Sequence, residues 1–130
     1  MAILTGFPCF LDEKPHFEND GINGAFHLGK CLASLKKKVT LIIENYATKE
    51  LTEIKEEYMS DLNKSVSDNF DFLFLEYGSE PLSKASQAKL KEIKEKYGVI
   101  LSIERSSLGL GNAYYTMKCI DVSSLVCPVD

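Results

Sequence analysis

The sequence predicts one α/β domain, a three-layer sandwich in which helices cover both faces of a mainly parallel sheet. Short, almost wholly apolar runs such as VTLIIE (39–44) alternate with longer amphipathic segments along the chain. Continuous apolar runs are typical of strands that are buried on both faces of a parallel sheet. The length of 130 residues fits a single domain that buries its own core.

The expected elements follow one another as β-α-β-α-β-α-β, and right-handed crossovers then give a Rossmann-like arrangement. Strands are expected where apolar and β-branched residues are continuous, at 2–5, 39–44, 70–76 and 99–104. Helices are expected where apolar residues recur every three or four positions, at 21–37, 48–65 and 83–97. The segment 114–126 is expected to be irregular or to form short strands.

Each helix has an apolar face that predicts which side packs on the sheet. The side chains expected to point inward are Phe26, Cys31 or Leu32, and Leu35 on the first helix; Leu51, Ile54, Tyr58, Leu62 and Val66 on the second; and Leu90 and Ile93 on the third.

Composition and charge exclude several function classes. The net charge of −4 argues against nucleic acid as a partner, and no apolar run approaches the roughly 20 residues of a membrane span. The basic run 36–38 is expected at a helix C-terminus, where cations complement the helix dipole. The four cysteines form no CxxC pair and there are only two histidines, so no metal site and a reducing, intracellular compartment are expected.

Ligands of open parallel sheets bind beyond the carboxyl ends of the strands. The residues expected there are Thr5-Gly6-Phe7, Glu44-Asn45, Glu76-Tyr77-Gly78 and Glu104-Arg105-Ser106. We expect two or three of these ends to meet in one crevice, which would be the binding site for a small molecule.

Two glycine-containing segments near the N-terminus are candidates for ligand binding. Thr5 and Gly6 end the first strand, and the alternative is a simple tight turn. Asp20, Gly21 and Gly24 begin the first helix, where glycine lets a carboxylate or phosphate approach the free N–H groups. The alternative for Asp20 is an ordinary helix N-cap.

Charged and aromatic residues near the C-terminus supply further candidates. Arg105 suits bidentate capture of a carboxylate, and Glu104 suits acid–base chemistry; a structural ion pair is the alternative for both. Tyr114 is expected either in the core or at the ligand. The motif Gly109-x-Gly111 lacks the third glycine and the following βαβ unit of a dinucleotide site, so no nucleotide cofactor is expected.

These residues, taken in order, resemble the C-terminal domain of the D-glutamate cyclase family. The resemblance rests on short blocks spread over the whole chain: Thr5-Gly6-Phe7-Pro8, Asp20-Gly21 with Gly24-Ala25, Ile103-Glu104-Arg105, Tyr114-Tyr115, Asp121-Val122 and Val126-Cys127-Pro128-Val129-Asp130. Ile22-Asn23 departs from a pair expected to be prolines. Similar proteins continue with a glycine-rich loop and an acidic segment, so residues 1–130 are expected to form the N-terminal part of that domain.

The resemblance implies a lyase that dehydrates D-glutamate to 5-oxo-D-proline, in mitochondria for animal members. The chemistry of this reaction, applied to the residues at the motif positions, assigns acid–base roles to Asp20 and Glu104. Substrate binding is expected at Thr5, Gly6, Gly21, Gly24, Arg105 and Tyr114. Two other functions stay open: a module that binds an acidic metabolite without turnover, and an interaction fragment that uses an exposed sheet edge. Self-association into a homo-oligomer is open as well.

Overall fold

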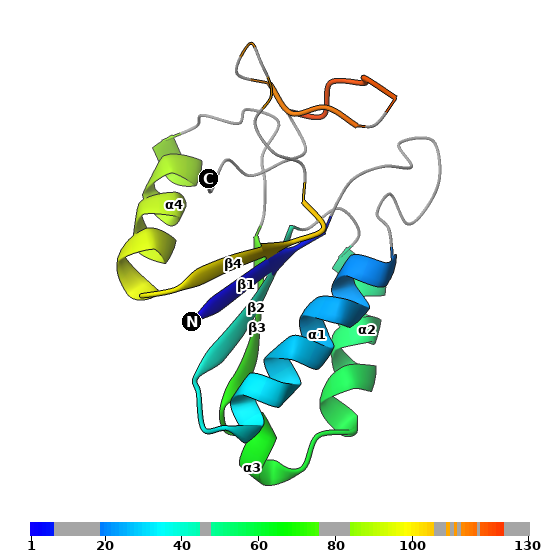
Figure 1. Ribbon diagram of the computed structural model, residues 1–130, viewed down its shortest axis with the longest axis vertical. Coiled ribbons are helices and arrows are strands. Elements are labelled where there is room, and N and C mark those ends of the chain that lie inside the picture. The colour runs from blue at the N-terminus through cyan, green and yellow to red at the C-terminus, as the bar shows by residue number, and fades with distance from the viewer. Residues whose placement is uncertain are drawn as a thin grey trace.

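The computed structural model contains an α/β domain whose elements alternate along the chain (Figure 1). It describes residues 1–6, 19–44, 48–75, 84–105, 109, 111, 113–116 and 118–123. The strands are β1 (Ala2–Thr5), β2 (Val39–Glu44), β3 (Phe70–Leu75) and β4 (Ile100–Ile103), and the helices are α1 (Asn19–Ser34), α2 (Thr48–Ser60), α3 (Lys64–Ser67) and α4 (Lys84–Lys96).

The four strands form one parallel sheet in the order β3-β2-β1-β4. In the register of the central strand, Thr5 lies beside Ile43 of β2 and Ile103 of β4. The expectation of an α/β fold with a parallel sheet is therefore confirmed. β1 and β2 match the expected 2–5 and 39–44, whereas β3 and β4 are shorter at their ends than 70–76 and 99–104.

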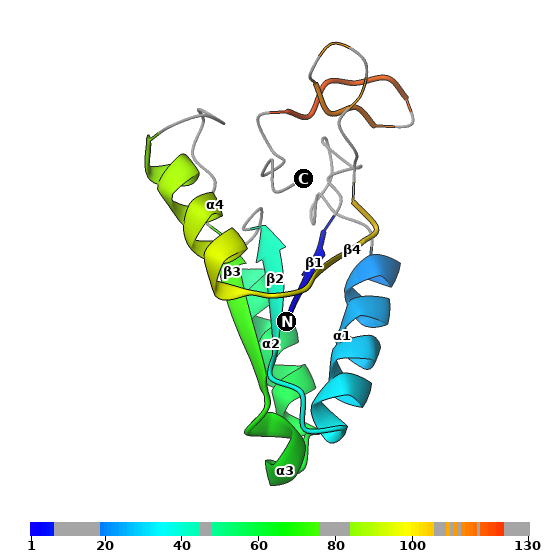
Figure 2. The same cartoon turned by 60° about the vertical axis from the view of Figure 1, so that its left-hand side comes forward.

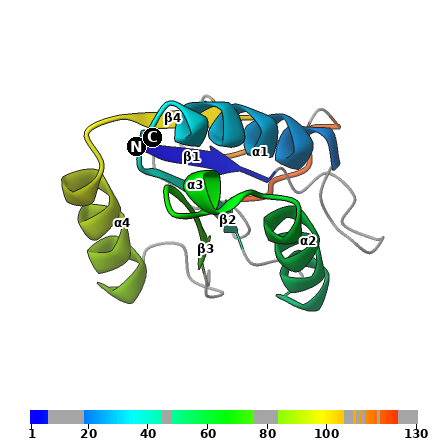
Figure 3. The same ribbon diagram turned by 90° about the horizontal axis from the view of Figure 1, so that it is seen from below.

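Side chains alternate between the two faces of the sheet, and each face has its own core. Figures 2 and 3 show α4 on one side of the sheet and α1 on the other. On one face, Ile3, Leu41 and Ile43 pack with residues from α1, α2 and α3. On the other face, Leu4 and Ile42 pack with Ile93 of α4. The sheet is thus the middle of three layers, and the expected inward position of Ile93 is confirmed.

α1 begins and ends earlier than the expected 21–37. At its C-terminus, Lys37 N donates to Leu32 O (3.1 Å) and Lys36 N to Ala33 O (2.9 Å), with Lys36 at a φ of 63°. This is a Schellman ending, with lysine where glycine is usual. No basic residue lies within the last turn of α1, but residues 36–38 follow directly after its C-terminus, where the basic run was expected.

The early end of α1 also decides its inner face. Leu32 packs against the core and Cys31 is exposed, which settles the alternative between them. Leu35 lies beyond the helix and is 68% exposed, so its expected inward position is wrong. Phe26 is buried as expected, and it stacks on Tyr58 of α2 with ring centroids 4.1 Å apart.

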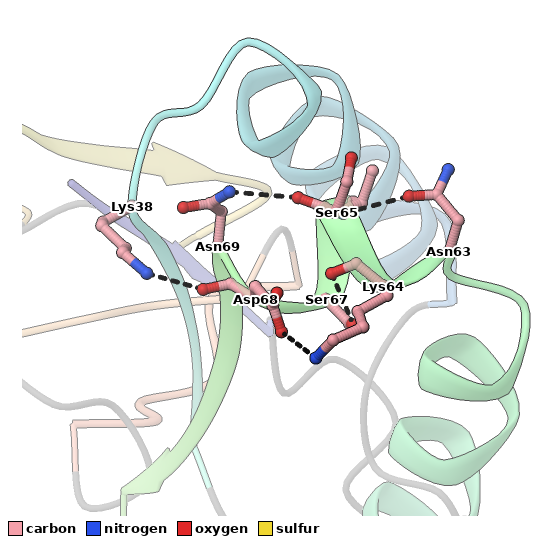
Figure 4. Close-up of polar contacts among 8 residues, drawn as sticks. Lys38, Asn63, Lys64, Ser65, Ser67, Asp68 and Asn69 are labelled. Carbon is pink, nitrogen blue, oxygen red and sulfur yellow. Dashed lines mark hydrogen bonds and ion pairs between the residues drawn. The ribbon is translucent and has the colours of Figure 1, made fainter.

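The single helix expected at 48–65 is divided into α2 and the short α3. Asn63 has an extended backbone and its side chain accepts a hydrogen bond from Val66 N at 3.1 Å, which starts α3 with an N-cap. Figure 4 shows this cap beside two further bonds, from Asn69 to Ser65 O and from Lys38 to Asp68 O. Together these bonds fix the amino edge of the sheet.

Candidate functional site

The order in which strands are added to the sheet reverses between β1 and β4. Because β2 and β3 extend from one side of β1 and β4 lies on the other, the chain segments that leave β1 and β4 diverge. Open α/β sheets bind ligands at such a reversal, outside the carboxyl ends of the strands. In Figures 1 and 2 the first turn of α1 and the segment after β4 both lie at this end.

Two residues with positive φ angles lie side by side directly after the ends of β1 and β4. Thr5 and Ile103 are paired in register, and the next residues, Gly6 and Glu104, have φ angles of 107° and 48°. Glycine adopts this conformation freely. For a residue with a side chain it costs about 1 kcal/mol, so Glu104 sits in a strained backbone position.

Gly21, in the first turn of α1, contacts both strand ends. A Cβ added to Gly21 would stand 2.5 Å from the Glu104 Cβ and 3.2 Å from the Thr5 Oγ1. A contact of 2.5 Å requires a shift of the neighbouring chain, so this position accepts only glycine in the observed packing. The structure therefore brings together Thr5, Gly21 and Glu104, three of the residues that the sequence singled out.

The Thr5 hydroxyl is the least satisfied group of this cluster. Thr5 is fully buried, and its Oγ1 has no hydrogen-bond partner among the residues that the structure describes. A buried hydroxyl without a partner costs about 1–3 kcal/mol. Most buried polar groups in proteins are paired, so Thr5 requires an explanation of its own.

The charged candidates lie at the same edge. Glu104 is exposed, and Arg105 follows it with a half-buried side chain whose Nε and Nη1 atoms are buried. Asp20 belongs to the first turn of α1, one residue after the helix begins, rather than at the N-cap position that was its alternative. Its side chain lies outside the described part of the structure.

Gly24 and Tyr114 occupy different surroundings. Gly24 is exposed on α1, and a Cβ there would meet no atom within 4 Å. Tyr114 is buried against Val122 in a small cluster separate from both cores of the sheet. Its main chain is held by bonds from Val122 N to Tyr114 O (2.8 Å) and from Tyr114 N to Ser123 Oγ (2.9 Å).

The segment around Tyr114 folds back on itself beyond β4 (Figure 1). Tyr115 and Asp121 form an antiparallel bridge, which fulfils the expectation of irregular or short-strand structure there. Bonds from the side chain and main chain of Ser123 lower the pKa of Asp121. Sequence reasoning missed this turn, although Asp-x-Ser is a pattern that favours it.

Two cavities lie away from these residues. One of 630 Å³ opens at the amino edge of the sheet, lined partly by Lys38, Asp68 and Tyr97. Another of 240 Å³ lies between α1 and α2, where Tyr58 donates a hydrogen bond to Asn23 Oδ1. We place the candidate site at the carboxyl edge instead, because parallel α/β sheets bind their ligands there.

Several strand-end residues fall outside the described structure, namely Phe7, Asn45, 76–78 and Ser106. Within the described residues, no three His, Cys, Asp or Glu side chains gather in a way that would hold a metal ion. No helix in that part of the chain has both the length and the apolar character to cross a membrane.

Comparison with known proteins supplies the family. A family model described as "D-glutamate cyclase-like, C-terminal" matches residues 1–130. The human protein named "D-glutamate cyclase, mitochondrial" is 26% identical over 131 residues, which take in all of this chain and 21% of the human protein. No solved structure matches. The chain thus spans about a fifth of the length of that relative.

The resemblance seen in the short sequence blocks is confirmed by this match, because the family model extends over the complete chain rather than over one motif. The strand ends that carry the blocks Thr5-Gly6 and Glu104-Arg105 are neighbours at the reversal of the sheet. With its full length matched, the chain belongs to the D-glutamate cyclase-like family, in the part that the family describes as C-terminal.

Proposed function

We propose that this chain carries a D-glutamate cyclase site, which converts D-glutamate to 5-oxo-D-proline and water. The observation that carries the proposal is the meeting of Thr5, Gly21 and Glu104 at the reversal of the sheet, in a chain that belongs to this family along its whole length. The name of the human relative supports the substrate and a mitochondrial location.

The reaction joins two ends of one molecule. The α-amino nitrogen, once it has lost a proton, attacks the γ-carboxyl carbon and forms the new C–N bond. The tetrahedral intermediate then loses the second proton from nitrogen and releases one carboxyl oxygen as water. A site for this reaction needs a base, a proton donor for the leaving oxygen and donors for the oxyanion.

The residues of the site can be given roles in this scheme. Glu104 and Asp20 are the proposed acid–base groups, and Glu104 is held at φ 48° by the exit of β4. Arg105 is the proposed anchor for a substrate carboxylate, since a guanidinium binds carboxylates through two parallel bonds. Holding the substrate folded, with amine and γ-carboxyl in contact, would supply much of the rate.

The test is to incubate the purified chain with D-glutamate and with L-glutamate, with and without added divalent metal. Product is followed by chiral chromatography of 5-oxoproline. We expect stereoselective product from the unaltered chain and at least a hundredfold less from Arg105→Ala, which corresponds to about 2.7 kcal/mol of transition-state binding. Lys37→Ala removes an exposed cation from the opposite edge and should keep full activity.

A folded chain that yields no product under any of these conditions would refute the catalytic proposal. If the same chain still binds D-glutamate, the function would be binding of an acidic metabolite without turnover. If Lys37→Ala lowers 5-oxoproline formation as much as Arg105→Ala does, the loss reflects the change in net charge and not a site at the end of β4.

A further inference from the structure

The proposed function leaves the Thr5 hydroxyl unexplained. Thr5 ends β1, is fully buried and has no hydrogen-bond partner for Oγ1 among the described residues. Thr116, the other threonine that is buried among the described residues, shows the usual situation, because its Oγ1 accepts a bond from Ile120 N at 3.2 Å. The contrast indicates that Thr5 keeps a hydroxyl for a partner that is not part of the described chain.

The position of Oγ1 indicates what that partner is. Oγ1 lies 3.2 Å from the point that a Cβ on Gly21 would occupy. Gly21 belongs to the first turn of the 16-residue helix α1. The N-terminus of a helix carries partial positive charge and favours anions. A hydroxyl beside it donates one more hydrogen bond to the same anion.

We infer that Thr5 is a specificity residue whose hydroxyl donates to a carboxylate of the ligand at the start of α1. This inference rests on the proposed function, because it assigns one recognition contact within the same site. The Glu104 side chain stands over this position with its Cβ and Cγ next to Gly21, and it is exposed. Because the Glu104 Cβ is fixed to the main chain, the main chain at Glu104 must shift when a carboxylate enters from the carboxyl edge.

The ligand of the proposed function carries two carboxylates and no phosphate group. We therefore expect the position to select carboxylates over inorganic phosphate.

Glutarate is the suitable probe, because it has both carboxylates of glutamate and no amine and so cannot cyclise. Its binding to the complete chain is measured by titration calorimetry. We expect Thr5→Val, which keeps the shape and removes the hydroxyl, to weaken glutarate binding at least tenfold. Thr5→Ser keeps the hydroxyl and should bind within about threefold of the unaltered chain, and Thr40→Val at the amino edge should bind normally.

Thermal unfolding without ligand supplies a second readout that a purely structural role would not produce. Removing an unpaired buried hydroxyl relieves its desolvation cost, so Thr5→Val should melt a few degrees higher, roughly 3–5 °C. Thr116→Val should melt lower, because it leaves Ile120 N without its partner. Thr5→Val would thus gain stability and lose ligand binding together.

The inference is overturned if Thr5→Val binds glutarate as the unaltered chain does, if phosphate binds equally tightly, or if Thr5→Val melts lower in the way expected for Thr116→Val. Absence of glutarate binding to the unaltered chain overturns it too. The two proposals fail separately. Glutarate binding that depends on Thr5, without any 5-oxoproline, refutes only the cyclase, and turnover that Thr5→Val leaves unchanged refutes only the contact.

Discussion

The two edges of the sheet are built in opposite ways. At the amino edge, polar groups are paired: Lys38 Nζ donates to Asp68 O at 2.6 Å, Asn69 to Ser65 O at 3.1 Å, and Asn63 caps α3 (Figure 4). Tyr97 Oη, which is buried without a partner among the described residues, is an exception there.

The carboxyl edge combines three features that cost stability. It has the unpaired Thr5 hydroxyl, a left-handed Glu104 and a position that admits only Gly21. Strain and unsatisfied groups concentrate at functional sites, where the surrounding structure maintains them. The amino edge also has one left-handed residue, Lys36, and one buried unpaired hydroxyl, Tyr97 Oη. The difference is that at the carboxyl edge the three features lie together around Gly21.

The largest expected effect separates two glycines of α1. A Cβ on Gly29 would stand 2.2 Å from Cε2 of the buried Phe70 ring, so Gly29→Ala should lower the free energy of unfolding by about 2 kcal/mol. Gly21→Ala should also lower the free energy of unfolding, because its Cβ would stand 2.5 Å from the Cβ of Glu104, and it should in addition weaken glutarate binding. Urea unfolding and calorimetry measure both. Equal losses of binding in the two variants would remove the distinction between the edges.

A smaller effect compares Glu104 and Lys36, two residues other than glycine that have positive φ angles and lie at opposite edges of the sheet. Glu104→Gly and Lys36→Gly, at φ 48° and 63°, should each raise the free energy of unfolding by about 1 kcal/mol. Only Glu104→Gly should abolish 5-oxoproline formation. If Glu104→Gly does not raise the free energy of unfolding, contacts of the Glu104 side chain within the fold offset the cost of its backbone conformation.

The smallest expected effect is the pH dependence of stability that comes from Tyr58 on α2. Burial, with a lesser contribution from the charge of Glu57, raises the pKa of Tyr58 above its ordinary value of 10.0. The folded state thus favours the neutral phenol, so this contribution to stability is complete below pH 10 and is lost as the pH rises further. Tyr58→Phe should reduce the fall in melting temperature at alkaline pH, and an unchanged fall would assign it to other groups.

The sequence predicted the fold well where the signal is local. β1 and β2 match their expected bounds because their apolar runs are continuous, and these runs end at polar residues or turns. The C-terminus of α1 was misjudged since its left-handed residue is Lys36, which carries no turn signal of the kind that glycine gives. The break before α3 did have a signal in Asn63, a frequent N-cap, which the helical periodicity of Tyr58, Leu62 and Val66 concealed.

The sequence predicts where the candidate site lies, at the strand ends, but not the contacts within it. Strand ends are visible in the sequence, so Thr5 and Glu104 could be named. Their proximity depends on β4 lying beside β1, and right-handed crossovers alone do not decide which neighbour β4 takes. The conformation of Glu104 and the approach of Gly21 follow from that tertiary arrangement, and no local pattern encodes them.

The paired exits of β1 and β4 also bear on how such a protein changes over generations. Because Gly6 and Glu104 leave the sheet at the same level, the position of the candidate site is defined by the main chain. Substitutions of side chains around it can then alter which molecule is accepted while the position itself is inherited. Descendants of one ancestral chain could diverge in chemistry and still keep their site in the same place.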